Sequence, residues 1–109
     1  MGKADVLAAF DDVLRLPEAE KSGNILADEL KRRASGFVTH DRQGLVEAVR
    51  EWLESHDEVL TIQAAVLIRE FHLSELREST KRIREEVAAG GFMRPSSIWI
   101  FDKAIAGLE

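Results

Sequence analysis

Apolar residues recur at helical spacing along almost the whole chain, and no long stretch alternates apolar and polar residues as a strand would. Near the start, Val6, Phe10 and Val13 lie three or four positions apart, which places them on one face of a helix. The pattern predicts an all-α protein. Its six helices are expected over roughly residues 3–16, 18–35, 41–55, 58–71, 74–89 and 97–107.

Residues that start or stop helices set these boundaries. Pro17 is expected to end the first helix, because proline lacks the backbone N–H, and Gly36 is expected to end the second. Gly90 and Gly91 follow the fifth. Side chains of the type that caps helix N-termini precede the later helices. The predicted caps or starts are Thr39 or Asp41, then Asp57, then Ser74 or the region of His72, and finally Ser96 or Ser97.

The fourth predicted helix carries apolar residues around most of its circumference, from Val59 to Phe71. A helix of that kind is typically enclosed by its neighbours. We therefore expect it to be the most buried helix of the protein. The residues expected to be least exposed are Leu60, Val66, Leu67, Ile68 and Phe71.

The second and third helices, and the fourth and fifth, form two candidate hairpins that start 39 residues apart, near Glu18 and Asp57. In the second hairpin, an apolar helix with Ala64 and Ala65 at its centre precedes a charged helix that ends with residues 82–87. This arrangement resembles the HEAT and armadillo-like repeats. The resemblance implies antiparallel helices in stacked hairpins that form an α-α superhelix.

The resemblance covers residues 18–90 of a chain that we expect to form one helical domain, 1–109. Residues 18–56 and 57–90 are the candidate repeats, and residues 1–17 and 91–109 are candidate caps. Because about three repeats are usually needed for a self-supporting stack, a closed six-helix bundle is the alternative.

Composition narrows the class of protein. Hydrophobic residues make up 45% and charged residues 32%, as in an ordinary globular protein, and the absence of cysteine excludes disulfides and thiolate chemistry. No apolar run is long enough to span a membrane, and the first residues lack a signal-peptide pattern, so we expect a cytoplasmic protein. A net charge of −5 argues against nucleic acid as the partner.

Three histidines, His40, His56 and His72, lie 16 positions apart, and the first two are followed by aspartate. His-Asp pairs occur in metal-dependent phosphohydrolases, but this chain offers no matching set of further ligands and no His-x-x-x-His pair on one helix. We interpret these histidines as residues of helix boundaries beside capping aspartates. The sequence thus predicts no catalytic residue, no metal site and no cofactor.

Candidate contact residues cluster near the C-terminus. Residues 98–101 are all large and apolar, so they cannot all face one side of a helix. If Ile98, Phe101, Ile105 and Leu108 face inward, Trp99 points away, near Lys103, unless it packs in a groove instead. Exposed tryptophan beside apolar neighbours is typical of an interface. The predicted contact residues here are Trp99, Ile100, Phe92 and Met93.

A second candidate surface is acidic. Residues 41–58 contain six acidic side chains and two arginines, a net charge of −4. Such a segment attracts a basic partner, although it is equally typical of ordinary solubility charge. The predicted contact residues in this segment are Glu47, Glu51, Glu54 and Glu58.

These observations favour a non-catalytic protein–protein interaction module, of which an immunity- or antitoxin-type protein is a specific version. Its partner would be another protein, with a basic protein as one option, or a second copy bound through the C-terminal helix. The alternative is an enzyme or nucleic-acid-processing accessory protein with a histidine/carboxylate pocket. A cleft that gathers His40, His56 and Asp57 would favour that alternative.

Overall fold

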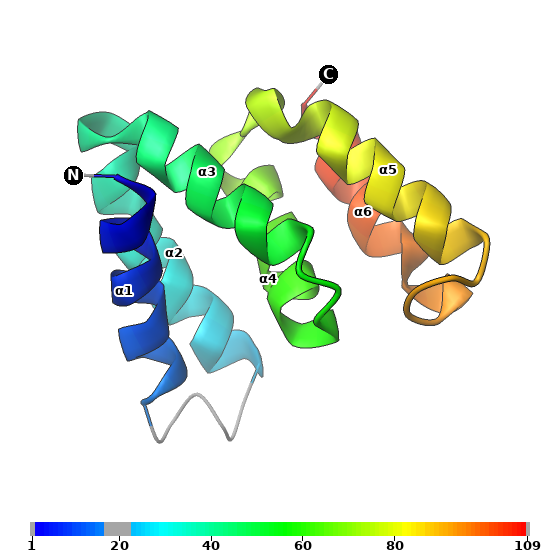
Figure 1. Cartoon of the computed structure of the whole chain (residues 1–109), viewed down its shortest axis with the longest axis horizontal. Helices are drawn as coiled ribbons and strands as arrows, with labels where there is room; N and C mark the ends of the chain where they lie inside the picture. The colour runs from blue at the N-terminus through cyan, green and yellow to red at the C-terminus, as the bar shows by residue number, and fades with distance from the viewer. Residues whose placement is uncertain (1, 17–22, 109) are drawn as a thin grey trace. The chain divides into compact units, whose positions relative to one another are not determined.

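The computed structural model describes residues 2–16 and 23–108 (Figure 1). Within these ranges the chain forms six α-helices and no strand, which confirms the predicted all-α class. Two short 3-10 helices, η2 and η3, precede the last two α-helices. The helices are α1 (Lys3–Leu14), α2 (Gly23–His40), α3 (Arg42–Leu53), α4 (Glu58–Phe71), η2 (Ser74–Leu76), α5 (Arg77–Ala88), η3 (Pro95–Ser97) and α6 (Ile98–Ala106).

The chain divides into two compact units, Met1–Ala48 and Val49–Glu109, and the boundary falls within α3. In the first unit, α1 packs against α2, and the two helices run in opposite directions (Figure 1). Val6, Phe10 and Val13, the residues that predicted the first helix, are fully buried. The predicted stop at Pro17 and the start of the second helix at residue 18 lie outside the described residues.

The prediction that Gly36 ends the second helix is wrong, because α2 continues through Gly36 to His40. Glycine ends a helix by adopting a left-handed backbone, and Gly36 stays helical. The stop lies at Asp41, whose N–H still donates to Phe37 O at 2.8 Å. The Asp41 side chain then accepts from the N–H of Gly44 at 3.1 Å. Asp41, one of the two predicted caps, therefore begins α3.

In the second unit, α6 packs against both α4 and α5. The predicted bounds of the fourth helix are confirmed, since α4 spans Glu58–Phe71 and Asp57 caps it by accepting from Leu60 N at 3.1 Å. α4 ends where His72 adopts a left-handed backbone, with φ at 51°. The assignment of residues 18–56 and 57–90 as repeats, with caps on either side, stays a prediction.

The prediction that α4 is the most buried helix is wrong, because six of its fourteen residues are buried, against seven of the twelve residues of α3. Leu67 and Ile68 are buried, but Leu60, Val66 and Phe71 are only half-buried. Val59 is 53% exposed. The buried face is instead completed by small or polar residues, which pack closely although they add little to an apolar pattern. These residues are Thr61, Gln63, Ala64 and Ala65.

The last two helices begin differently from the prediction. The fifth was expected from Ser74 or the region of His72, but residues 74–76 form η2 and the α-helix starts at Arg77. The sixth was expected to be capped by Ser96 or Ser97, yet Ser96 lies inside η3 and Ser97 makes no capping side-chain hydrogen bond. Both helices are entered through a 3-10 turn, a common way to begin an α-helix. Among the described residues, none of the helices combines the length and the hydropathy that a membrane span requires.

Candidate protein-contact surface

The apolar residues of α6 differ in their exposure to solvent. Phe101 and Ala104 are buried, whereas Ile98, Ile100 and Ile105 are half-buried. Trp99 is 55% exposed, which resolves the two interpretations left open by the sequence in favour of an outward-facing tryptophan. Because successive residues turn by about 100° around a helix, burial of Phe101 directs Trp99 toward solvent. We call Trp99, with its helix neighbours Ile98 and Ile100, the α6 surface.

Two contacts of charged side chains lie at or beside the α6 surface. The ammonium group of Lys103 lies 5.1 Å from the centre of the Trp99 ring, a cation–π contact between neighbours on one helix face. Arg84 of α5 donates from Nε to Asp102 Oδ1 at 2.7 Å. Its hydrogen bond to Asp102, followed by that to Glu85, raises the pKa of Arg84, so the guanidinium stays charged. α6 is therefore tied to α5 beside Trp99.

The predicted contact residues Phe92 and Met93 lie in the connector of residues 89–94, between α5 and η3. Both are half-buried, and Met93 has a left-handed backbone with φ at 61°. The ring of Phe92 lies edge-on to the ring of His56, with centroids 5.1 Å apart. Phe92 is thus placed beside the turn that precedes α4.

The four predicted acidic contact residues differ in their surroundings. Glu47 is half-buried in α3, and it belongs to the first compact unit. Glu51, Glu54 and Glu58 are exposed in the second unit. Arg82 Nη2 donates to Glu54 Oε1 at 3.1 Å, so α5 balances the charge of Glu54. The acidic segment is therefore less negative, at this position, than its sequence suggests.

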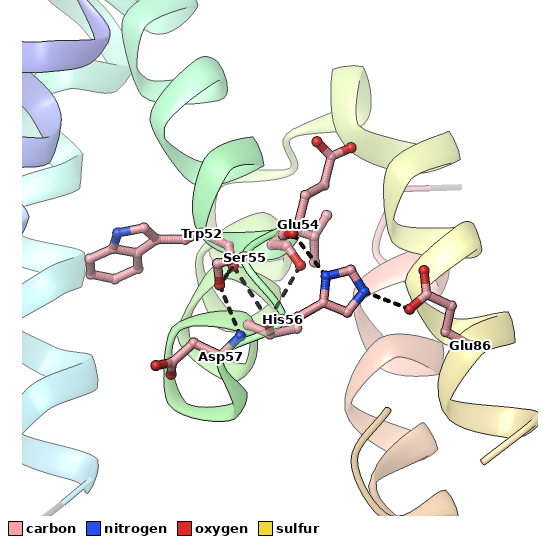
Figure 2. A network of polar contacts seen from close by, with 8 residues as sticks. Trp52, Glu54, Ser55, His56, Asp57 and Glu86 are labelled. Atoms are coloured by element: carbon pink, nitrogen blue, oxygen red, sulfur yellow. Dashed lines mark hydrogen bonds and ion pairs between the residues drawn. The ribbon is translucent and has the colours of Figure 1, made fainter. Parts of the chain in front are cut away.

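His56 occupies the turn between α3 and α4 with φ at 57° (Figure 2). Its Nδ1 lies 3.2 Å from the carbonyl oxygen of Glu54, and its Nε2 lies 2.8 Å from Glu86 Oε2. A carbonyl and a carboxylate only accept hydrogen bonds, so each ring nitrogen faces an acceptor. The hydrogen bond to Glu86, reinforced by the negative charge of that residue, raises the pKa of His56 above 6.5.

Ser55 and Asp57, on either side of His56, support the backbone (Figure 2). Ser55 Oγ donates to Trp52 O at 2.7 Å, and the N–H of Asp57 donates back to Ser55 Oγ at 3.2 Å. The Asp57 carboxylate caps α4, as Asp41 caps α3. The interpretation of both aspartates as caps is therefore confirmed. In this arrangement neither nitrogen of His56 is free to take a proton from Ser55.

The carboxylate beside His56 is Glu86, which sequence analysis did not assign to a site. Glu86 lies 30 positions from His56, and no local spacing marks the pair. His40 is the last residue of α2, and His72 places Nδ1 2.9 Å from Gly107 O. Within residues 2–16 and 23–108, no group of three or more histidine and acidic side chains could hold a metal ion.

Comparisons of the chain with protein-family models, curated proteins and solved structures found no match. The resemblance to HEAT and armadillo repeats accordingly stays a prediction. The function has to be inferred from the geometry of the chain itself.

Proposed function

We propose that this protein is a cytoplasmic protein–protein interaction module that binds its partner through the α6 surface. The observation that carries the proposal is the 55% exposure of Trp99 between two half-buried isoleucines on a helix whose opposite face is packed. Large apolar side chains left at the surface together are typical of contact sites. Tryptophan contributes disproportionately to binding energy when a partner buries it.

The surroundings of Trp99 favour binding with little rearrangement. The Lys103 ammonium group lies over the indole ring, and the Arg84–Asp102 hydrogen bond joins α6 to α5. A side chain ordered before binding loses less conformational entropy on contact. The α6 surface therefore has the features of a preformed contact site.

The charge of the chain favours a basic partner. Its net charge of −5 attracts positively charged proteins over distances longer than a direct contact. The exposed Glu51 and Glu58 lie in the same compact unit as α6. Charge of this kind accelerates encounter, whereas the burial of Trp99 would supply most of the affinity.

The test is capture of partners from the native cell by the immobilised full chain, with quantitative mass spectrometry. Trp99→Glu is compared with Ile25→Glu, which makes the same kind of change at another exposed apolar residue, 41% exposed in α2. We expect the proteins enriched by the wild-type chain to be lost with Trp99→Glu and retained with Ile25→Glu. Circular dichroism of both variants checks that they remain helical.

One further result would argue against the α6 surface, and another would identify the partner as a second copy rather than a basic protein. Equal capture by the wild-type chain and by Trp99→Glu would place the contact elsewhere, with the acidic residues as the next surface to test. Sedimentation equilibrium of the purified chain tests for the second result, because it measures the oligomeric state. A wild-type dimer that becomes a monomer only in Trp99→Glu would show that the surface binds a second copy.

A further inference from the structure

One side chain, His56, contacts three segments of the second unit, and Figure 2 shows its contacts with two of them, its own turn and α5. Its Nδ1 is directed to the Glu54 carbonyl within its own turn, and its Nε2 is directed to the Glu86 carboxylate on α5. Its ring also lies against Phe92 in the connector, with the two ring planes at 63°. We call this group of four residues the His56 clasp.

The protonation state of the imidazole decides whether both hydrogen bonds of the His56 clasp can form. A neutral imidazole has one N–H and one nitrogen lone pair, whereas an imidazolium has two N–H groups. Both oxygens that face the ring are acceptors, so only the imidazolium satisfies both contacts. After loss of a proton, one nitrogen lone pair faces an oxygen lone pair, which is repulsive.

We propose that the His56 clasp is a proton-dependent device: protonation of His56 ties the α3–α4 turn to α5 and holds Phe92, and deprotonation releases the connector. Its role rests on the proposed function, because the connector leads through η3 into α6 and its contact surface. The clasp would thus make the order of the segment before α6 depend on pH.

Three other acidic groups near His56 have partners of their own. Glu54 bonds to Arg82 of α5, and the Asp57 carboxylate accepts from Leu60 N. Glu85 bonds to Arg84. This leaves Glu86 as the carboxylate bonded to the ring. The charged residues on the segments around His56 are Glu54, Asp57 and Glu58 from the turn and α4, Arg82, Glu85 and Glu86 from α5, and Arg94 from the connector.

The direction of the pH dependence follows from the raised pKa of His56. A histidine whose pKa is higher in the folded chain than in the unfolded chain stabilises the fold when it is protonated. The contribution is fully present below the unfolded value, 6.5, and is lost as the pH rises through the folded value. The clasp therefore closes on the acidic side and opens on the alkaline side of this range.

The test is an NMR titration of the free full-length chain, which follows the Cε1–H resonance of His56. We expect Glu86→Gln to lower the titration midpoint of His56 by roughly 0.2–0.7 pH units, the range for an exposed ion pair. Glu85→Gln is the matched control, because it removes the same charge from the adjacent position, where the carboxylate bonds to Arg84. We expect it to shift the midpoint less.

A second measurement tests whether protonation of His56 also affects the connector, as the clasp requires, or only the ion pair with Glu86. In the wild-type chain, the amide resonances of Phe92 and Met93 should shift with the same midpoint as His56. In His56→Asn, which keeps a residue that tolerates a left-handed backbone, these shifts should disappear.

Equal His56 midpoints in the wild-type chain and in Glu86→Gln would overturn the proposal. So would connector amides that do not change across the titration of His56. Because no partner is present, either failure leaves the proposed function of the α6 surface standing. Conversely, unchanged capture by Trp99→Glu would leave the clasp itself untouched.

Discussion

Both compact units bury the apolar faces of short helices, and the second unit in addition holds polar contacts between residues that are far apart along the chain. In the first unit, Asp41 bonds to Gly44 and Arg32 bonds to Glu29, each three positions away. In the second unit, local contacts such as the Asp57 cap are joined by polar contacts between residues 18 to 35 positions apart. These contacts are Arg84–Asp102, Arg82–Glu54, His56–Glu86, Arg77–Leu108 and His72–Gly107.

The difference separates what local sequence can encode from what tertiary packing adds. A pair three positions apart lies on one turn of helix and forms whenever that turn forms. A pair 30 positions apart forms only after the helices have packed. The second unit thus carries polar constraints that depend on its tertiary structure, and variants of the two kinds of contact can be compared directly.

The largest effects should come from the apolar cores, which both units share. Leu30 in α2 and Leu67 in α4 are almost fully buried. Truncation of either to alanine should lower the free energy of unfolding by roughly 2–5 kcal/mol, because it removes apolar contacts and leaves a cavity. Urea unfolding followed by far-UV circular dichroism measures this. Val59→Ala, on the exposed face of α4, is the control and should change stability by less than about 0.5 kcal/mol.

A loss below about 1 kcal/mol for Leu67→Ala would contradict the burial of that face of α4. A normal loss for Leu67→Ala with none for Leu30→Ala would show that the first unit depends less on its core than its burial indicates.

Two glycines test the local contacts of the first unit with opposite signs. A Cβ atom at Gly44 would lie 2.4 Å from Asp41 Oδ2, so Gly44→Ala must displace the capping side chain. We expect a loss of about 0.5–2 kcal/mol, the usual value of a cap. A Cβ atom at Gly36 would meet no atom within 4 Å, so Gly36→Ala should stabilise α2 by about 0.5–1 kcal/mol.

Differential scanning calorimetry of the two glycine variants gives the measurement. Melting temperatures that move in the same direction would show that Asp41 does not occupy the position described, or that Gly36 is not an ordinary helical residue.

The cap at Asp57 tests a local contact in the second unit. Asp57→Ala removes the acceptor for Leu60 N and should cost about 0.5–2 kcal/mol. Asp57→Asn keeps an acceptor of similar capping strength and should cost much less. Thermal unfolding of both variants makes the comparison. An equal loss in the two would show that the charge of Asp57, rather than the hydrogen bond, stabilises α4.

The smallest effect should be that of a metal chelator. His56 and His72 bond to Glu86 and to Gly107 O, so their positions need no metal ion. A strong chelator should change the melting temperature by less than about 1 °C, since loss of a structural metal removes much of the folding energy. A drop of many degrees would contradict the assignment of these histidines to helix boundaries.

The distinction between local and long-range contacts also explains which features could be predicted from the sequence. The helical class, the bounds of α4 and the caps Asp41 and Asp57 follow from local patterns, and the structure confirms them. The prediction for Gly36 was wrong because the low helix propensity of glycine, about 1 kcal/mol less favourable than that of alanine, is overridden by its context in a long helix. Local patterns therefore predict elements better than their ends.

Burial and the candidate site were harder to predict. An all-round apolar pattern in α4 does not show which part of its circumference is covered, and Leu60 and Val66 lie at the margin. The exposure of Trp99 was one of two interpretations, because spacing gives the direction of a side chain but not what packs there. Glu86 could not be assigned to His56 at all, since only the packing of α5 beside the turn brings them together.

The unequal exposure of the two tryptophans lets intrinsic tryptophan fluorescence report on the α6 surface. Trp52 is 4% exposed and Trp99 is 55% exposed, and the sequence has no others. A water-soluble collisional quencher reaches the indole of Trp99 while Trp52 is shielded. Emission therefore divides into a quenchable part from α6 and a protected part from α3. Occupation of α6 by any partner can then be followed as the loss of the quenchable part, with no attached dye.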